Sequence, residues 1–132
     1  MNGRRILLVD EEDKILDRYS FLLSKEGYHA VTTNSGSKAI EQLHKQPFDI
    51  VITDLAMRNK NGQTILEEIR EMLPLIPVIV LTDKISNIIR HFASLLGACA
   101  LIKKPCSYKV LISSIRKSFL VEDSNSYLDK RK

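Results

Sequence analysis

Near its start the chain reads ILLVDEED (residues 6–13), in which four apolar residues run directly into four acids. The apolar half is short and bounded by charge, which suits a strand buried in a sheet. The acidic half needs its own explanation, because like charges repel and carboxylates are costly to bury. We therefore predict a buried strand within residues 4–10 that carries a polar group, Asp10, at its carboxyl end.

The same order of a short apolar run and a helical pattern recurs along the chain. Apolar runs typical of strands lie in residues 4–10, 28–33, 47–54, 76–83 and 98–105. Apolar residues at helical spacing follow them in residues 11–27, 34–46, 61–73, 86–97 and 107–120. Strands that alternate with helices pair in parallel, because each helix carries the chain back across the sheet. The sequence thus predicts an α/β fold, a doubly wound (βα)5 three-layer sandwich around a parallel five-stranded sheet.

Length and composition are those of one globular domain. The chain has 132 residues, of which 44% are apolar and 27% charged, and this is enough apolar material for a proper core. Periodicity is lost after residue 120. We assign residues 1–120 to the domain and residues 121–132 to a tail or the start of a linker.

Charge and hydropathy argue against several classes of protein. The net charge of +4 comes from clusters at the two ends and from scattered lysines, without the basic stripe typical of nucleic-acid binding. No apolar run approaches a membrane span, and no signal peptide is apparent. Cys99 and Cys106 lack a metal-binding spacing, and Cys99 is predicted to be buried. We expect a cytoplasmic protein with free thiols, no direct nucleic-acid contact and no membrane partner.

Unusual residues stand where four of the predicted strands end. The strand ends carry Asp10 with Glu11, Asp54, Thr82 with Asp83, and Lys104. Because parallel strands place their carboxyl ends at one edge of the sheet, these side chains should converge in one crevice. Clustered carboxylates are tolerated around Mg²⁺, which prefers oxygen ligands and can bridge an acid to a phosphoryl group. Asp54 would then be a nucleophile, while Thr82 and Lys104 would contact phosphoryl oxygens.

Each of these residues also has an ordinary structural explanation. A lone Asp at a strand end is usually a turn or cap residue, and Glu11, Glu12 and Asp13 would stabilise a helix amino terminus. Thr82 alone is typical of a strand, and Lys104 alone is typical of a solvated surface. The hypothesis of a site depends on the coincidence of all these residues at the same end of different strands.

Four motifs, in this order, resemble the receiver domain of bacterial two-component response regulators. They are ILLVDEE (6–12), DIVITDLAMRNKNG (49–62), PVIVLTD (77–83) and GACALIKKP (97–105). The resemblance covers about residues 4–120, so it makes residues 1–120 the receiver domain. It implies a flavodoxin-like fold with strand order 2-1-3-4-5.

The resemblance also implies a metal site. Asp54 would be the phosphoacceptor and one of the ligands of Mg²⁺. Glu11 would take the place of the usual direct ligand, and Asp10 would act through water. The backbone carbonyl of Ala56 would complete the protein ligands.

Two further residues would engage the phosphoryl group once it is on Asp54. Thr82 would bond to it and draw its own loop inward. Lys104, which precedes what is usually a cis peptide at Pro105, would form an ion pair with it.

The chain departs from the pattern of this family at four positions. Glu11 stands where Asp is usual, and its extra methylene predicts weaker or shifted metal binding. Asp83 replaces a small residue beside Thr82; we favour a helix cap over a side chain that faces the site, with Ser86 and Asn87 as competing caps. Arg58 stands where proline is usual, which predicts a looser loop after Asp54. Leu101 stands where an aromatic switch residue is common.

The expected function is that of a phosphoacceptor receiver domain in a two-component phosphorelay. Phosphorylation of Asp54 by a sensor histidine kinase or a phosphotransfer protein would switch a surface on the fourth helix, fifth strand and fifth helix. That surface would bind a downstream protein, an output domain or a second copy of the chain. The chain would catalyse at most its own phosphorylation and dephosphorylation.

Three alternative interpretations stay open. The four departures favour a degenerate receiver that acts as an interaction module without phosphorylation. A haloacid-dehalogenase-type phosphatase ranks low, because Ala56 stands where that class needs a second Asp. A DNA-binding transcription factor would require an output domain beyond the five β–α units.

Overall fold

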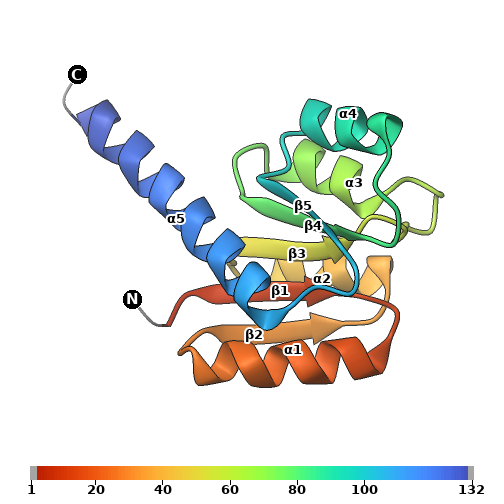
Figure 1. Cartoon of the computed structure of the whole chain (residues 1–132). Coiled ribbons are helices and arrows are strands. Elements are labelled where there is room, and N and C mark those ends of the chain that lie inside the picture. Colours follow the sequence, from red (N-terminus) through yellow and green to blue (C-terminus); the bar gives the residue numbers. More distant parts are fainter. Residues whose placement is uncertain (1–2, 131–132) are drawn as a thin grey trace.

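Strands and helices alternate along the chain in the computed structural model, which describes residues 3–130 and their side chains as far as residue 120. The elements in order are β1 (Arg5–Val9), α1 (Asp13–Lys25), β2 (His29–Thr33), α2 (Gly36–Lys45), β3 (Ile50–Asp54), α3 (Ile65–Met72), β4 (Val78–Thr82), α4 (Asn87–Leu95), β5 (Ala100–Lys103) and α5 (Tyr108–Lys130). All neighbouring strands are parallel, in the order β2-β1-β3-β4-β5 (Figure 1). The predicted doubly wound (βα)5 sandwich and its strand order are confirmed.

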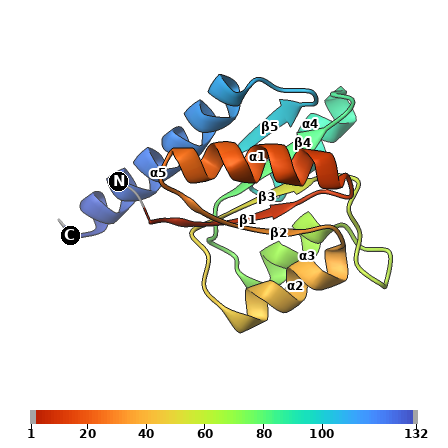
Figure 2. The same cartoon turned by 90° about the horizontal axis from the view of Figure 1, so that it is seen from below.

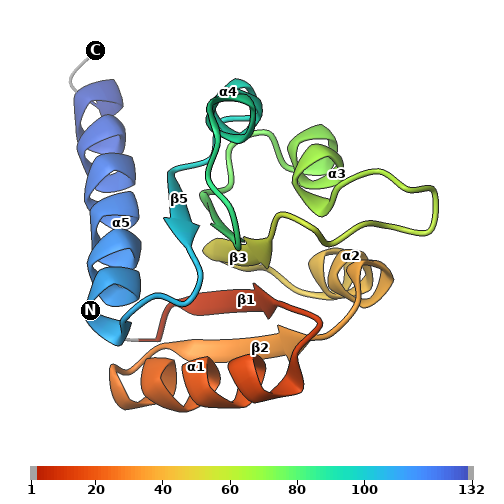
Figure 3. The ribbon, with the colours of Figure 1, turned by 45° about the vertical axis from the view of Figure 1, so that its right-hand side comes forward.

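Alternate residues of each strand face two different cores, as the period of a strand requires. Leu8, Ile52 and Ile79 stand side by side across the sheet and pack under α1 and α5. The intervening Leu7 and Val51 point to the opposite face, under α2 and α3. Figure 2 and Figure 3 show these helices as outer layers on either side of the sheet. A sheet buried on both faces explains why its strands read as continuous apolar runs.

Polar caps fix where three of the helices begin. The Ser35 side chain caps α2, and Thr64 forms a capping box with Glu67 at the start of α3. Ser86 caps α4, where its Oγ accepts a hydrogen bond from the backbone N–H of Ile89 at 3.1 Å. The preferred assignment of Asp83 as this cap is therefore wrong. An N-cap directly precedes its helix, and α4 begins only at Asn87.

Helix α5 is longer than the sequence pattern predicts. It runs over Tyr108–Lys130, so the backbone of residues 121–130 continues the helix that the pattern ended at residue 120. Figure 1 shows its carboxyl-terminal half projecting away from the sheet. The assignment of these residues to a tail or linker stays a prediction.

The prediction that Cys99 is buried is wrong. Cys99 is exposed and lies just before β5, which is an edge strand of the sheet. An edge strand is covered less completely than a central one, so an apolar sequence there does not guarantee burial.

Within the described part of the chain, none of the helices combines the length and the apolar composition that crossing a bilayer requires.

Candidate functional site

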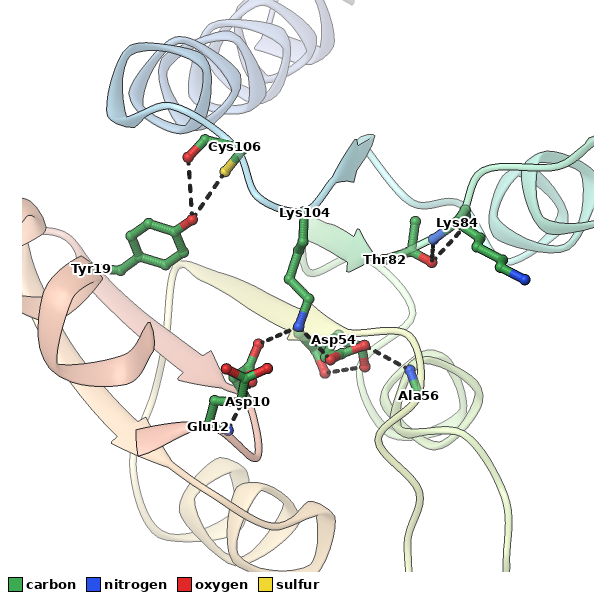
Figure 4. Close-up of polar contacts among 10 residues, drawn as sticks. Asp10, Glu12, Tyr19, Asp54, Ala56, Thr82, Lys84, Lys104 and Cys106 are labelled. Carbon is green, nitrogen blue, oxygen red and sulfur yellow. Dashed lines mark hydrogen bonds and ion pairs between the residues drawn. The ribbon is translucent and has the colours of Figure 1, made fainter. Parts of the chain in front are cut away.

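Three strands deliver charged side chains to one edge of the sheet. Asp10 follows β1, Asp54 is the last residue of β3, and Lys104 follows β5. The Nζ atom of Lys104 lies 2.9 Å from Oδ2 of Asp10 and 2.7 Å from Oδ2 of Asp54 (Figure 4). The fold thus joins residues that are 94 and 50 positions apart in the sequence. We call these three residues the acid–lysine cluster.

Burial makes the charge balance of the acid–lysine cluster important. Asp10 is fully buried, Asp54 is 8% exposed, and the side chain of Lys104 is also 8% exposed. Two carboxylates face one ammonium group, which leaves one negative charge in excess. Because water screens little at such a place, this excess favours the approach of a further cation.

Lys104 is a permanent cation at neutral pH. Burial by itself would lower its pKa, but the hydrogen bonds to Asp54 and Asp10 and their charges outweigh burial. The pKa of Lys104 is therefore raised above its ordinary value. An ammonium group of this kind can pair with a phosphoryl oxygen without first gaining a proton.

The remaining carboxylate oxygens are held by the loops that follow each strand. Oδ1 of Asp10 accepts a hydrogen bond from the backbone N–H of Glu12 at 2.9 Å. Oδ1 of Asp54 accepts one from the N–H of Ala56, also at 2.9 Å, and the N–H of Met57 donates to the Asp54 carbonyl at 3.1 Å. The orientation of the Asp54 carboxylate therefore depends on the backbone of residues 55–57.

Glu11 is not part of the acid–lysine cluster. The residue is exposed, and the described side chains contain no group of three His, Cys, Asp or Glu residues placed to hold a metal ion. The oxygens of Asp10 and Asp54, with their excess negative charge, nevertheless suit a hard divalent cation such as Mg²⁺. The donor chemistry fits such an ion at these two residues, and the role of Glu11 stays a prediction.

Thr82 ends β4 at the same edge, but its hydroxyl is engaged elsewhere. Its Oγ1 donates to the carbonyl oxygen of Lys84 at 2.9 Å and accepts from the Lys84 N–H at 3.3 Å. Figure 4 shows this hydroxyl turned toward Lys84 and away from Lys104. Contact with a group on Asp54 would require Thr82 to exchange these bonds.

A pocket of about 330 Å³ adjoins the acid–lysine cluster between α1 and the segment after β5. Its lining includes Lys104, the exposed Asp83, and Tyr19 with Cys106. The Tyr19 hydroxyl lies 3.3 Å from Sγ of Cys106, and burial together with this hydrogen bond raises the pKa of Tyr19 to about 12. No pattern in the sequence points to the pairing of Tyr19 with Cys106, because 87 positions separate them.

The loop after Asp54 (residues 55–64, here the β3–α3 loop) is tied at several points. Nη1 of Arg58 donates to the carbonyl of Gly62 at 2.9 Å, and Asn59 N–H donates to the carbonyl of Gln63 at 2.8 Å. The N–H of Ile65 closes the base of the loop on the carbonyl of Met57 at 3.0 Å. These bonds close the loop on itself, and the loosening expected from Arg58 in place of proline stays a prediction.

Leu101, at the position where the family commonly has an aromatic switch residue, is half-buried. It packs against the core on the α2–α3 face of the sheet.

Comparison with known proteins agrees with this architecture. The family model described as "Response regulator receiver domain" matches residues 6–116. A CheY-like receiver domain protein from Methanospirillum hungatei JF-1 has a TM-score of 0.85 at 23% identity, and the match covers 94% of this chain and 99% of that chain. A receiver domain protein from Clostridium thermocellum has a TM-score of 0.81 at 29% identity, with 91% and 97% covered.

A longer protein is also similar over this region. NtrX from Brucella abortus, solved in complex with ADP, has a TM-score of 0.84 at 24% identity. The match covers 98% of this chain but 30% of NtrX. The same fold therefore makes up nearly the whole of the shorter solved chains and only a part of a longer one.

Proposed function

The chain belongs to the response regulator receiver domain family, and on that premise we propose that Asp54 accepts a phosphoryl group and that this modification changes a partner-binding surface. The observation that supports the proposal most directly is the acid–lysine cluster. A buried carboxylate at a strand end, 2.7 Å from a permanent ammonium group, is a nucleophile beside a ready counter-ion for a phosphoryl group.

The proposed reaction is a displacement at phosphorus. An oxygen of the Asp54 carboxylate forms a bond to the phosphorus of a donor phosphohistidine while the phosphorus–nitrogen bond breaks. The bonding electrons stay with the nitrogen, and the ring takes up a proton from solvent. The products are an acyl phosphate on Asp54 and a free imidazole on the donor. Lys104 then moves its ion pair from the carboxylates to an oxygen of the phosphoryl group.

Divalent-metal binding is a general property of this family. Here Asp10, Asp54 and the carbonyl of Ala56 would hold Mg²⁺, joined by Glu11 if its side chain turns inward. When bound, the ion supplies positive charge that offsets the charge developing on the phosphoryl oxygens. Oδ2 of Asp10 accepts a hydrogen bond from Lys104 at 2.9 Å, and the Ala56 N–H keeps the other oxygen of Asp54 in place.

The proposed output depends on Thr82 and α4. When Thr82 leaves Lys84 to bond with the phosphoryl group, residues 83–86 would be drawn toward the site, and α4 would move with them. Ile88 and Leu95 on α4 are 82% and 72% exposed, so a partner could bind them directly. The proposed partners are a sensor histidine kinase or phosphotransfer protein on the input side, and a downstream protein, an output domain or a second copy on the output side. We place these events in the cytoplasm.

Incubation with acetyl phosphate and Mg²⁺, followed by intact-protein mass spectrometry, tests the proposal. We expect the wild type to gain one phosphoryl group and Asp54→Asn to gain none. The control Asp17→Asn alters an exposed carboxylate on α1 and should behave as the wild type. Equal incorporation in Asp54→Asn would refute the assignment of the acceptor.

A second candidate is an interaction module that works without phosphorylation. Two observations favour it: Glu11 lies outside the acid–lysine cluster, and the Thr82 hydroxyl already has partners in Lys84. In that case the wild type would gain no phosphoryl group, and acetyl phosphate would leave partner binding unchanged.

A further inference from the structure

We propose that Gly36, the first residue of α2, is a positioning residue for the β3–α3 loop and, through it, for the carboxylate of Asp54. Gly36 touches no reacting group. It acts because its lack of a side chain lets the start of α2 lie directly against the backbone of Arg58. The inference rests on the proposed function, since Asp54 is taken as the acceptor.

Gly36 leaves no room for a larger residue. A Cβ atom at Gly36 would lie 2.5 Å from Cδ1 of Ile65 and 2.8 Å from the carbonyl carbon of Arg58, with the Arg58 carbonyl oxygen closer still. Cβ atoms in proteins essentially never lie within 3.0 Å of a heavy atom outside their own residue and its chain neighbours. Gly36 is buried and is not among the glycines with positive φ. Space at the contact, rather than backbone conformation, therefore requires glycine here.

Neither partner in the contact can move away freely. On the helix side, the Ser35 cap fixes the start of α2, and Ala39 in its first turns is fully buried in the core. On the loop side, Arg58 forms a bridge with Thr64, and the buried Met57 accepts a hydrogen bond from Ile65. Interiors packed in this way transmit a displacement instead of absorbing it.

A displacement of the Arg58 backbone would reach Asp54, which lies four residues earlier in the chain. The N–H groups of Met57 and Ala56 hold the carbonyl and Oδ1 of Asp54, and both residues lie between Asp54 and Arg58. A shift of the Arg58 backbone therefore changes the orientation of the carboxylate that would attack phosphorus. In-line attack is sensitive to orientation, because a misplacement of about 1 Å can cost up to about a hundredfold in rate.

Phosphorylation kinetics and backbone amide chemical shifts together test this inference. Gly36→Ala is compared with the wild type and with Ser37→Ala, an exposed change one residue further along the same helix. We expect Gly36→Ala to fold and to be phosphorylated by acetyl phosphate at least about tenfold more slowly than the wild type. In the absence of a phosphoryl donor and of metal, the amide signals of Ala56 and Met57 should also be shifted. Ser37→Ala should match the wild type in both measurements.

A double variant separates positioning from simple crowding of the core. Ile65→Val removes Cδ1, the core atom in the contact, but leaves the Arg58 carbonyl in place. We expect Gly36→Ala with Ile65→Val to stay slow and to keep the shifted Ala56 and Met57 signals. Restoration of the wild-type rate or signals by Ile65→Val would overturn the proposal, and so would a Gly36→Ala variant indistinguishable from Ser37→Ala.

The two measurements also separate this inference from the proposed function. If the wild type takes up no phosphoryl group, the proposed function fails, and the amide signals alone decide whether Gly36 positions the loop. If the wild type reacts but Gly36→Ala leaves both rate and signals unchanged, only the role of Gly36 fails.

Discussion

The β3–α3 loop and helix α4 follow neighbouring strands of the sheet, yet they are attached to the protein in different ways. The loop is closed by backbone hydrogen bonds within residues 54–65. Helix α3, which follows it, buries Ile65, Leu66 and Ile69. In α4, by contrast, Ala93 is the buried residue that anchors its middle, and two large apolar side chains face solvent. Under the proposed function, a carboxylate that attacks phosphorus benefits from a fixed geometry, whereas a surface that signals to a partner has to change. The proposal therefore assigns these two tasks to separate segments of the chain.

Removal of the Lys104 charge should lower the free energy of unfolding more than any other change proposed here, because Lys104 holds Asp54 at the start of the β3–α3 loop. Lys104→Met leaves Asp10 and Asp54 buried without their cation, and loss of one partner of a buried ion pair costs about 4 kcal/mol. Urea denaturation of this variant is to be compared with that of Lys103→Met, which changes the exposed neighbour. Equal free energies of unfolding for the two variants would show that the acid–lysine cluster does not stabilise the fold.

One substitution in each segment tests the contrast itself. Leu66 in α3 is 1% exposed and Leu95 in α4 is 72% exposed. Leu66→Ala should lower the free energy of unfolding by about 3 kcal/mol, because it leaves a cavity in the core. Leu95→Ala should change it by less than about 0.5 kcal/mol. A large loss for Leu95→Ala in the monomeric protein would mean that α4 is as firmly packed as α3.

Arg70 qualifies the contrast, because it ties one end of α4 to α3. Its guanidinium group donates to the carbonyls of Leu96 at 2.6 Å and Gly97 at 3.3 Å after α4, and to those of Leu73 and Pro74, both at 3.2 Å, after α3. Burial lowers the pKa of Arg70, but a guanidinium group remains charged at neutral pH. The attachment leaves the amino-terminal end of α4, next to Thr82, as the end that can move.

Substitution of Arg70 should destabilise the protein less than Lys104→Met or Leu66→Ala does, and its effect should be more local. Arg70→Met should lower the free energy of unfolding by about 2 kcal/mol, because several carbonyls lose a charged donor. Amide hydrogen exchange should speed up more in α4 than in α3, which has its own capping box. Arg90→Met, an exposed change in α4, serves as the control, and equal exchange in the two variants would contradict the anchoring role.

The sequence predicted the fold because the fold follows from patterns that can be read locally. Continuous apolar strands and amphipathic helices alternate, and this alternation forces parallel pairing. The meeting of Asp10, Asp54 and Lys104 also followed from topology, since parallel strands end at a common edge. Their chemical roles remain proposals, because topology shows where side chains gather and not what they react with.

Side-chain orientation and close contacts could not be predicted in the same way. Thr82 stands at the expected strand end, but only the structure shows that Lys84 takes its hydroxyl. Asp83 and Ser86 are both good capping residues, and the choice depended on where α4 begins. Gly36 looks like an ordinary helix-start glycine until the backbone of Arg58 is placed against it. Each of these features depends on a neighbour or a backbone path that the one-dimensional pattern does not give.

Direct mapping of the acceptor tests the central claim most sharply. After treatment with acetyl phosphate and Mg²⁺, borohydride reduction converts a phosphorylated aspartate into homoserine, which tandem mass spectrometry locates. The account predicts homoserine at residue 54 and at no other aspartate. Homoserine at Asp10 or Asp83 in place of Asp54, or none in a protein that is folded and supplied with Mg²⁺, would contradict it.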